Sequence, residues 1–354
     1  MALDVEAVVK RIEANPLGRL MYGQRELFHS NLIAWFFEQL PEVADAVFCP
    51  LTTAGVGQRR TVDRERQHLD LAFHWPDRAP LVVENKVFAL PDGAQLRSYA
   101  GLVAHWDPRP SLVLLALSPP DFDSGDWRYV SYAEFASRIR EALPDTAEYE
   151  VETMRRYASL VADLHELMQV VEVRSDDEPV WLEDGAVTSI SSSQMRSALQ
   201  KARAQRVASV LNSTIPDLNR LAKGALSNAT PLVEILESTQ VGGREVLAGW
   251  QLQGNQFRRA IVVWGRGMEG RTADLKVRRE VFAREHSELF TFPLGLAQKH
   301  AGRKEFNHFA PNFVYQYVKA PGLTIGELKA AALTIHREVR NLTDESVREA
   351  KVSK

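Results

Sequence analysis

Two short apolar segments, each with an acidic residue at an inner position, constrain the fold of this chain more than any other feature. The first is His68–His74, which carries Asp70, and the second is Leu81–Lys86, which carries Glu84. A carboxylate is costly to bury without a partner, so acids inside apolar strands are unusual. The residues between the segments, 75–80, are rich in turn formers, which favours an antiparallel hairpin.

The expected register of this hairpin brings the two acids together. If the turn is centred on Asp77, the numbers of cross-strand partners sum to 154, which places Asp70 opposite Glu84. Directly opposed side chains have Cβ atoms about 4.5–5.5 Å apart, and like charges there repel. Lys86 follows Glu84 by two residues and therefore projects from the same face. A divalent cation would remove the carboxylate repulsion, and hard oxygen ligands of this kind suit Mg²⁺.

An acid followed, after a gap, by Glu-x-Lys resembles the PD-(D/E)XK nuclease superfamily, whose fold is called restriction-endonuclease-like. Asp70 would be the first acid of the pattern, and Glu84-Asn85-Lys86 its second motif. Thirteen residues separate the two acids, a length suited to one hairpin. Leu69 stands where the superfamily pattern has a proline.

Two flanking helical patterns resemble those of a bacterial branch of this superfamily. A Glu-x-x-x-Ser helix, here Glu26 to Ser30, precedes the core, and a Gln-Leu-x-x-Tyr helix, here Gln95 to Tyr99, follows the lysine. The resemblance covers roughly residues 20–165. It implies a nuclease that hydrolyses phosphodiester bonds with the help of a metal ion.

The resemblance also implies a role for each motif residue. Asp70, Glu84 and the carbonyl of Asn85 would hold Mg²⁺ or Mn²⁺, and Lys86 would favour the hydroxide form of the attacking water. The alternative is that the acids face solvent as ordinary hairpin residues and pair with arginines, while the lysine is a solvated residue at a strand end. Their central positions within apolar strands favour the metal site.

Two further residues are candidates because of the flanking helices. Glu26 would add a carboxylate to the site, although an acid at a helix N-terminus is also favoured by the helix dipole alone. Gln95 would orient Lys86 or contact a phosphate, although it could equally be an ordinary residue of the first helical turn. We expect Tyr99 to belong to the core.

Composition sets the outer bounds of the prediction. A chain of 354 residues suggests two domains. The single cysteine, Cys49, excludes an internal disulfide framework and a multi-cysteine zinc site. No apolar run approaches the roughly 18 residues that span a membrane, and residues 1–6 are acidic, unlike a signal peptide. We therefore expect a cytoplasmic protein without membrane contact.

Charge is distributed unevenly along the chain. Residues 1–192 hold 18 lysines and arginines against 31 acidic residues, whereas residues 193–354 hold 25 against 15. A basic half predicts contact with nucleic acid, and the alternative is that it docks on the acidic half or on an acidic protein partner. The cluster Lys299–Lys304, followed by Phe306, Phe309, Tyr315 and Tyr317, suits phosphate contact and base stacking, although core packing is favoured for these aromatic residues.

The predicted fold class is α/β: a restriction-endonuclease-like mixed sheet flanked by helices over residues 1–172, followed by a second, α+β domain over residues 194–354. Residues 173–193 are polar and serine-rich, which predicts a linker. The predicted function is a metal-dependent nuclease acting on DNA more than RNA, in restriction, phage defence or repair. The alternative is a catalytically silent module that binds nucleic acid or a protein; a homo-oligomer is also compatible.

The expected elements follow from periodicity and turn residues. Helices are expected at 5–13, 25–40, 93–105, 132–143, 148–171, 194–225, 231–237 and 325–342. Strands are expected at 45–51, 67–74, 81–88, 111–117, 128–130, 244–252, 257–264, 273–277 and 313–318.

Overall fold

The chain divides into two units, which are described separately. The first comprises residues 1–170 and 184–199, and the second residues 171–183 and 200–354. The structure is a computed structural model, and it describes residues 3–21, 25–66, 68–182, 189–215, 221–265, 267–297 and 304–352.

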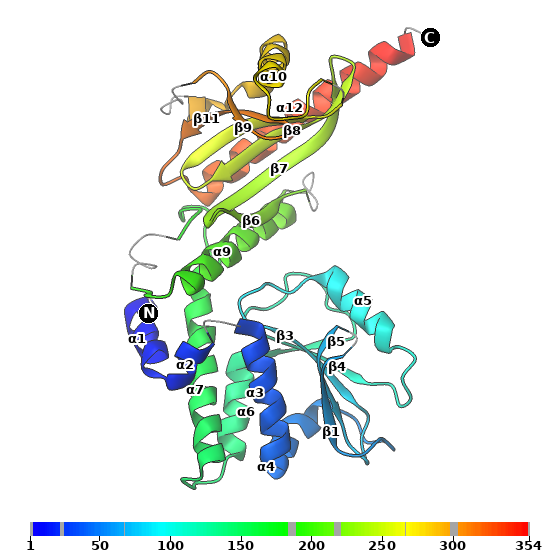
Figure 1. The fold of residues 1–354 in the computed structure, drawn as a ribbon, viewed down its shortest axis with the longest axis vertical. Helices are drawn as coiled ribbons and strands as arrows, with labels where there is room; N and C mark the ends of the chain where they lie inside the picture. Colours follow the sequence, from blue (N-terminus) through cyan, green and yellow to red (C-terminus); the bar gives the residue numbers. More distant parts are fainter. Residues whose placement is uncertain are drawn as a thin grey trace. The chain divides into compact units, whose positions relative to one another are not determined.

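A five-stranded mixed sheet forms the centre of the first unit, with strand order β1-β2-β3-β4-β5 (Figure 1). The first three strands are antiparallel neighbours, and β3, β4 and β5 run parallel. The strands are β1 (Thr61–Arg66), β2 (Leu69–His74), β3 (Leu81–Lys86), β4 (Ser111–Ala116) and β5 (Trp127–Ser131). The α/β class and the mixed sheet flanked by helices are therefore confirmed.

The helices of this unit lie on both faces of the sheet (Figure 1). They are α1 (Val5–Ala14), α2 (Pro16–Leu20), α3 (Arg25–Gln39), α4 (Pro41–Phe48), α5 (Gly93–Val103), α6 (Tyr132–Ala142) and α7 (Tyr149–Met168), with 3₁₀ turns at Cys49–Leu51 and Gln169–Val171.

The two faces of the sheet bury different sets of side chains. On one face, Leu96 and Val103 of α5 pack with Ala72, Val82 and Leu114, which are even-numbered residues of the strands. On the other face, aromatic rings from α3, α4 and α6 surround Phe73. Its ring centroid lies 4.7 Å from that of Phe37 and 4.7 Å from that of Phe48. Burial on both faces explains the continuous apolar run of β4.

The expectation of a strand at 45–51 is wrong, because these residues continue helix α4. Pro41 occupies the first helical turn, where its missing N–H costs nothing. Ala44, Val47 and Phe48 are buried and lie three and four residues apart, which is the spacing of one helical face. The strand that completes the sheet, β1, went unpredicted because its residues are polar, as an edge strand allows.

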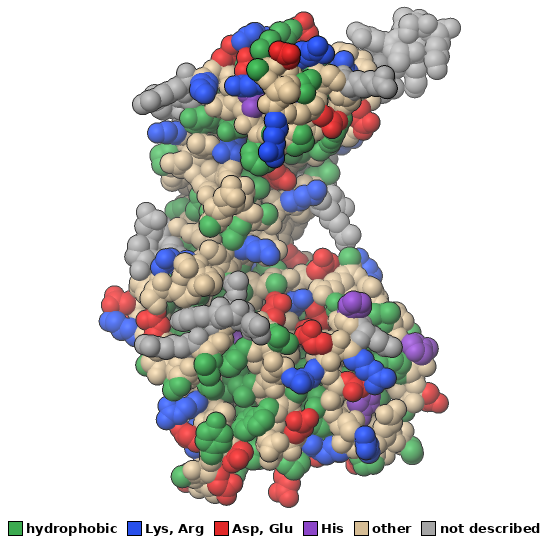
Figure 2. All heavy atoms as spheres, viewed as in Figure 1, with side chains coloured by type: hydrophobic (Ala, Val, Ile, Leu, Met, Phe, Trp, Pro, Cys, Tyr) green, Lys and Arg blue, Asp and Glu red, His purple; other side chains and the backbone are tan. Residues whose placement is uncertain are grey.

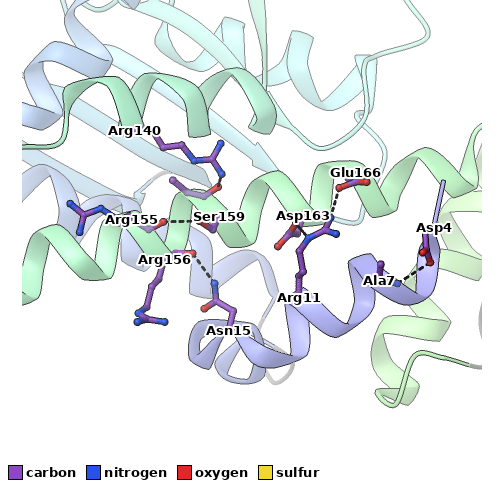
Figure 3. Close-up of polar contacts among 11 residues, drawn as sticks. Asp4, Ala7, Arg11, Asn15, Arg140, Arg155, Arg156, Ser159, Asp163 and Glu166 are labelled. Carbon is purple, nitrogen blue, oxygen red and sulfur yellow. Dashed lines mark hydrogen bonds and ion pairs between the residues drawn. The ribbon is translucent and has the colours of Figure 1, made fainter. Parts of the chain in front are cut away.

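Helix α1 packs along α7, with polar contacts at the margin of an apolar interface (Figure 3). Arg11 Nε donates to Asp163 Oδ1 at 2.7 Å, and Asn15 Nδ2 donates to the carbonyl of Arg156 at 2.8 Å. The Arg11 side chain remains 47% exposed, whereas Ile12 next to it is completely buried. Packing of the apolar face of α1 should therefore hold the helix more strongly than its ion pairs.

The second unit is built on a six-stranded antiparallel sheet with strand order β10-β11-β9-β8-β7-β6. Its strands are β6 (Lys223–Ser227), β7 (Thr230–Val241), β8 (Arg244–Gln253), β9 (Gln256–Val263), β10 (Asn307–Phe309) and β11 (Phe313–Lys319). The remaining elements are α9 (Ser193–Thr214), which crosses the boundary between the units, α10 (Ala273–Glu285), α11 (Leu294–Ala297), α12 (Ile325–Val352) and the 3₁₀ turn η4 (Ser287–Phe290).

Three expectations for this unit differ from the structure. The helix expected over 194–225 ends at Thr214, and residues 223–227 form β6. The helix expected at 231–237 is part of strand β7, where buried Val233 and Ile235 alternate with half-exposed residues. The strand expected at 273–277 is the start of α10, whose buried residues recur at helical spacing beyond that short window.

Residues 173–193 were expected to form a linker, but described parts of this segment pack into the units. Val180 is 1% exposed in the core of the second unit, and the Arg203 guanidinium donates to its carbonyl at 2.9 Å. Ile190 is fully buried and belongs to the first unit. Across the described residues, no helix has the length and apolar character required to cross a bilayer.

We predict that Ile12→Ala destabilises the first unit far more than Arg11→Ala. Loss of a fully buried isoleucine costs about 2–5 kcal/mol, whereas an exposed ion pair contributes about 0–1 kcal/mol. Urea denaturation of both variants, followed by circular dichroism, measures the difference. Equal shifts in the transition of the first unit would contradict this description of the α1–α7 interface.

Candidate active site

The hairpin register places the two motif acids on one face of the first sheet. The β2–β3 pairs include Leu71 with Val83 and Phe73 with Leu81, so partner numbers sum to 154 as predicted. The paired ladder ends at Leu71 and Val83, and Asp70 and Glu84 are the next residues of the two strands. The two acids share the parity of Ala72 and Val82, which pack under α5, although Leu69 next to Asp70 belongs to the same apolar cluster. The negative charge of Asp70 raises the pKa of Glu84, which indicates that the two carboxyl groups lie near each other.

The Asp70 side chain, rather than its backbone, binds the neighbouring strand β3. Its Oδ2 accepts a hydrogen bond of 2.7 Å from the backbone N–H of Asn85. Burial raises the pKa of Asp70, although the Asn85 N–H and the Lys86 ammonium act in the opposite direction. The carboxylate is thereby fixed against β3 at the position of the Glu-Asn-Lys motif.

Glu84 and Lys86 form an ion pair inside the site. Lys86 Nζ lies 2.8 Å from Glu84 Oε1, and the Glu84 side chain is only 2% exposed. Burial, followed by the negative charge of Asp70, raises the pKa of Glu84 to about 7. Burial alone would lower the pKa of Lys86, but the charge and hydrogen bond of Glu84, with the charges of Glu26 and Asp70, raise it overall. Two causes act together on these pKa values. Burial disfavours the charged forms, and the negative charges of the carboxylates outnumber the single positive charge of Lys86.

Asn85 projects from the opposite face and ties that face to two helices. Its Nδ2 donates to Ser30 Oγ at 3.1 Å and to the backbone carbonyl of Glu26 at 3.3 Å, both on α3. Its Oδ1 accepts a hydrogen bond from the Tyr132 hydroxyl at the start of α6. The middle residue of the motif therefore anchors β3 between α3 and α6, while its neighbours in the strand face the site.

Glu26 lies in the first turn of α3, close enough for its charge to act on the site. That charge raises the pKa of Asp70, Glu84 and Lys86. Among the described contacts, no hydrogen bond joins the Glu26 carboxylate to either acid of the strands. The structure thus brings Glu26 into the electrostatic surroundings of the pair rather than into direct contact.

Gln95 lies in the first turn of α5, on the same face of the sheet as the acids. Its Nε2 donates to the Tyr99 hydroxyl at 2.9 Å. Tyr99 is half-buried against the apolar cluster under α5. In this conformation the Gln95 amide is oriented by Tyr99, and no described hydrogen bond connects it to Lys86.

A metal ion at this site would take its protein ligands from few residues. Within the described ranges, no group of three or more His, Cys, Asp or Glu side chains is arranged to hold a metal. Mg²⁺ commonly uses one or two carboxylates and keeps several waters, so the donor set of Asp70 and Glu84 fits that ion. The raised pKa of Glu84 fits as well, because it reflects burial and then repulsion by Asp70, and a cation would relieve the repulsion.

A pocket of about 260 Å³ opens along β2, and neither Asp70 nor Glu84 is among the residues that line it. Ala72 and His74, which follow Asp70 along β2 on the same face, line it together with Trp106 and Asp63. The His74 ring stacks on Trp106 with centroids 5.9 Å apart, and its Nε2 lies 3.4 Å from Asp63 Oδ2. Burial lowers the pKa of His74, which favours its neutral ring.

The sequence did not reveal two of these features. The Tyr132 contact to Asn85 was missed, although a tyrosine that starts a helix after a buried strand has a hydroxyl in need of a partner. His74 was not selected from the sequence as a site residue, although it shares the parity of Asp70 along β2.

No family model matches the sequence, and comparisons with curated proteins and with solved structures give no match. The function is therefore inferred from the geometry of this site and from its sequence motifs.

We predict a pH-dependent loss of stability that depends on Glu84. In the unfolded chain the pKa of this carboxyl lies near 4.5, and in the folded protein it is raised to about 7. Its contribution to the free energy of unfolding is therefore fully present below pH 4.5 and is lost as the pH rises through about 7.

Urea denaturation across this pH window, with a chelator present, tests the prediction against Glu84→Gln, which cannot titrate. As the pH rises through this window, the free energy of unfolding of the wild type should fall relative to that of the variant. A difference that stays constant would show that Glu84 titrates normally.

Proposed function

We propose that this protein is a metal-dependent nuclease that hydrolyses phosphodiester bonds. The observation that carries the proposal is the placement of Asp70, Glu84 and Lys86 on one buried face, with a surplus of negative charge. The order of helix, antiparallel strands, helix and parallel strands around these residues supports a restriction-endonuclease-like core.

The proposed ligands of Mg²⁺ or Mn²⁺ are Asp70, Glu84 and the backbone carbonyl of Asn85. When bound, the ion would lower the pKa of a water molecule and neutralise charge on the scissile phosphate. Asp70 is suited to this task because the Asn85 N–H fixes one of its oxygens. Glu84 is suited because it is buried next to a second carboxylate and exchanges protons near neutral pH.

Lys86 would act on the water and on the phosphate. Its ammonium has three N–H donors, and one of them is directed at Glu84. A second donor could hold the attacking water, and a third could stabilise the negative charge that grows on the phosphoryl oxygens. The raised pKa keeps the ammonium charged, so Lys86 is proposed as an electrostatic stabiliser rather than a neutral base.

The remaining motif residues would support this set. Glu26 is proposed to strengthen the negative field or to contribute a further carboxylate, and Gln95 to contact the substrate from α5. The pocket at His74 and Trp106 would accommodate a part of the substrate next to the scissile phosphate. DNA is the preferred substrate class, and a cytoplasmic role in restriction, phage defence or repair fits such an activity.

The alternative is a module that binds nucleic acid or protein without cleaving it. One observation favours it: Glu84 and Lys86 already neutralise each other at 2.8 Å, as a purely structural pair would. The two functions differ in the response to metal, because a silent module would show no metal-dependent cleavage.

We predict that Asp70→Asn, Glu84→Gln and Lys86→Met each abolish metal-dependent cleavage while the protein stays folded. Each substitution removes a charge from the site with little change in volume. Cleavage is measured on plasmid, linear duplex, single-stranded DNA and RNA, with Mg²⁺ or with excess chelator. Asp126→Asn is the matched control, because Asp126 is a 64% exposed acid that pairs with Arg109.

Full activity in the control and loss in all three variants is expected. Wild-type cleavage that persists in excess chelator would contradict the metal-dependent mechanism. If no substrate is cleaved under any condition, the silent module is the better description.

A further inference from the structure

The sheet of the second unit has two unlike faces. Its helices pack on one face, where the core combines strand residues with residues of α9, α10 and α12. Members of this core include Leu211, Phe282, Ile335, Val246, Trp250 and Phe257. By the register of the sheet, all residues that β7, β8, β9 and β11 contribute to this core project from this one face. Helix α12 runs behind the sheet in the view of Figure 1.

The opposite side, here called the open sheet face, carries Arg258, Phe313, Tyr315 and Tyr317. The register joins them into rows across the sheet: Tyr317 pairs with Arg258, which pairs with Gln251. Among the described residues, no strand residue of this side belongs to the apolar core of the unit. Ala260 at its centre is buried, whereas Gln251, Arg258 and the three aromatic residues of this face are half-buried and keep part of their surface accessible.

Three aromatic rings follow one another along β11 on this face. The centroids of Phe313 and Tyr315 are 5.6 Å apart, and those of Tyr315 and Tyr317 are 6.3 Å apart. All three residues are half-buried, so each ring keeps part of its surface accessible.

The expectation that Phe306 belongs to the core is confirmed, but it is wrong for Phe309, which is 69% exposed, and for Tyr315 and Tyr317, which line the side of the sheet away from the core. Of the basic cluster Lys299–Lys304, all but Lys304 lies outside the described residues.

Arg258 is held on this face by neutral groups. Its guanidinium stacks over the Tyr315 ring at 4.6 Å and donates to the amide oxygens of Gln251, Gln253 and Gln256. Among the described residues, no carboxylate lies within ion-pair distance of it. The positive charge is therefore fixed in position while it remains free to attract an anion.

These features favour nucleic acid over a protein partner. Aromatic rings and an arginine plane offer stacking surfaces to bases. The second unit, residues 171–183 and 200–354, carries 25 lysines and arginines against 20 acidic residues, a positive balance that suits a polyanion. On the side shown in Figure 2, basic, acidic and hydrophobic side chains of this unit are interspersed.

We propose that the open sheet face binds single-stranded nucleic acid, with unpaired bases stacking on Tyr315, Tyr317 and Phe313. A duplex keeps its bases stacked on one another, so it cannot use such a surface in this way. The proposal rests on the proposed nuclease function for its choice of ligand class. It assigns the second unit the task of selecting unpaired strands for the first.

The test measures binding without cleavage. Fluorescence anisotropy with end-labelled single-stranded DNA, single-stranded RNA and duplex DNA is recorded on the full-length protein with a chelator present. Tyr315→Leu and Tyr317→Leu keep an apolar side chain but remove the aromatic surface, and each should weaken binding about fivefold or more. Tyr315→Phe and Tyr317→Phe should restore it. Tyr149→Leu is the control, because Tyr149 is a 75% exposed tyrosine of the first unit.

Equal affinity in the leucine variants, equal or tighter binding of the duplex, or no binding of any single strand would overturn the proposal. A second measurement does not depend on the variants. Ultraviolet crosslinking of wild-type protein to a photoreactive single strand should label the peptide Phe313–Lys319, and crosslinks confined to other peptides would also overturn it. If the protein binds single strands as predicted but cleaves no substrate, the binding role of this face is supported and only the nuclease function is rejected.

Discussion

The proximity of Asp70 and Glu84, which two adjacent antiparallel strands carry, is the constraint on which the first unit depends. The two carboxylates share a buried face with one ammonium, Lys86, while Glu26 adds further negative charge nearby. Such an arrangement is unfavourable for folding alone, since an apolar pair at the same positions would pack at no electrostatic cost. We propose that a bound cation offsets this cost.

The rest of the unit holds that unfavourable arrangement in place. The Asp70 carboxylate is bound by the Asn85 N–H, and the Asn85 side chain is bound on the other face by Ser30 and Tyr132. One residue of β3 thereby links the acids, helix α3 and helix α6. A site held by a sheet and by two packed helices is pre-organised, as catalysis by charge stabilisation requires.

The sequence predicted the hairpin well because its register is fixed by a short turn and by apolar residues on both faces. A slip of one residue would turn Leu71 and Phe73 out of the core, which is why the predicted pairing of β2 and β3 matches the structure. Prediction failed where local pattern was ambiguous. A five- or seven-residue window, as at 231–237 and 273–277, cannot separate a strand from a helical turn.

Other features could not be predicted because they depend on contacts between distant residues. The polar edge strand β1 is defined by its pairing with β2, and the Tyr132–Asn85 bond joins residues 47 positions apart. The side of the sheet on which Tyr315 and Tyr317 lie depends on where α12 packs, which the sequence of β11 alone does not contain.

Calorimetric titration of Mn²⁺ into the protein, at about pH 6.5 in two buffers of different ionisation enthalpy, tests the central claim most directly. Because the pKa of Glu84 is raised to about 7, metal binding should displace its proton, and the heat should depend on the buffer. Asp70→Asn and Glu84→Gln should each lose the binding isotherm. Absence of binding to the wild type, or binding that both variants retain with the same proton release, would contradict the assignment of this carboxylate pair as a metal site.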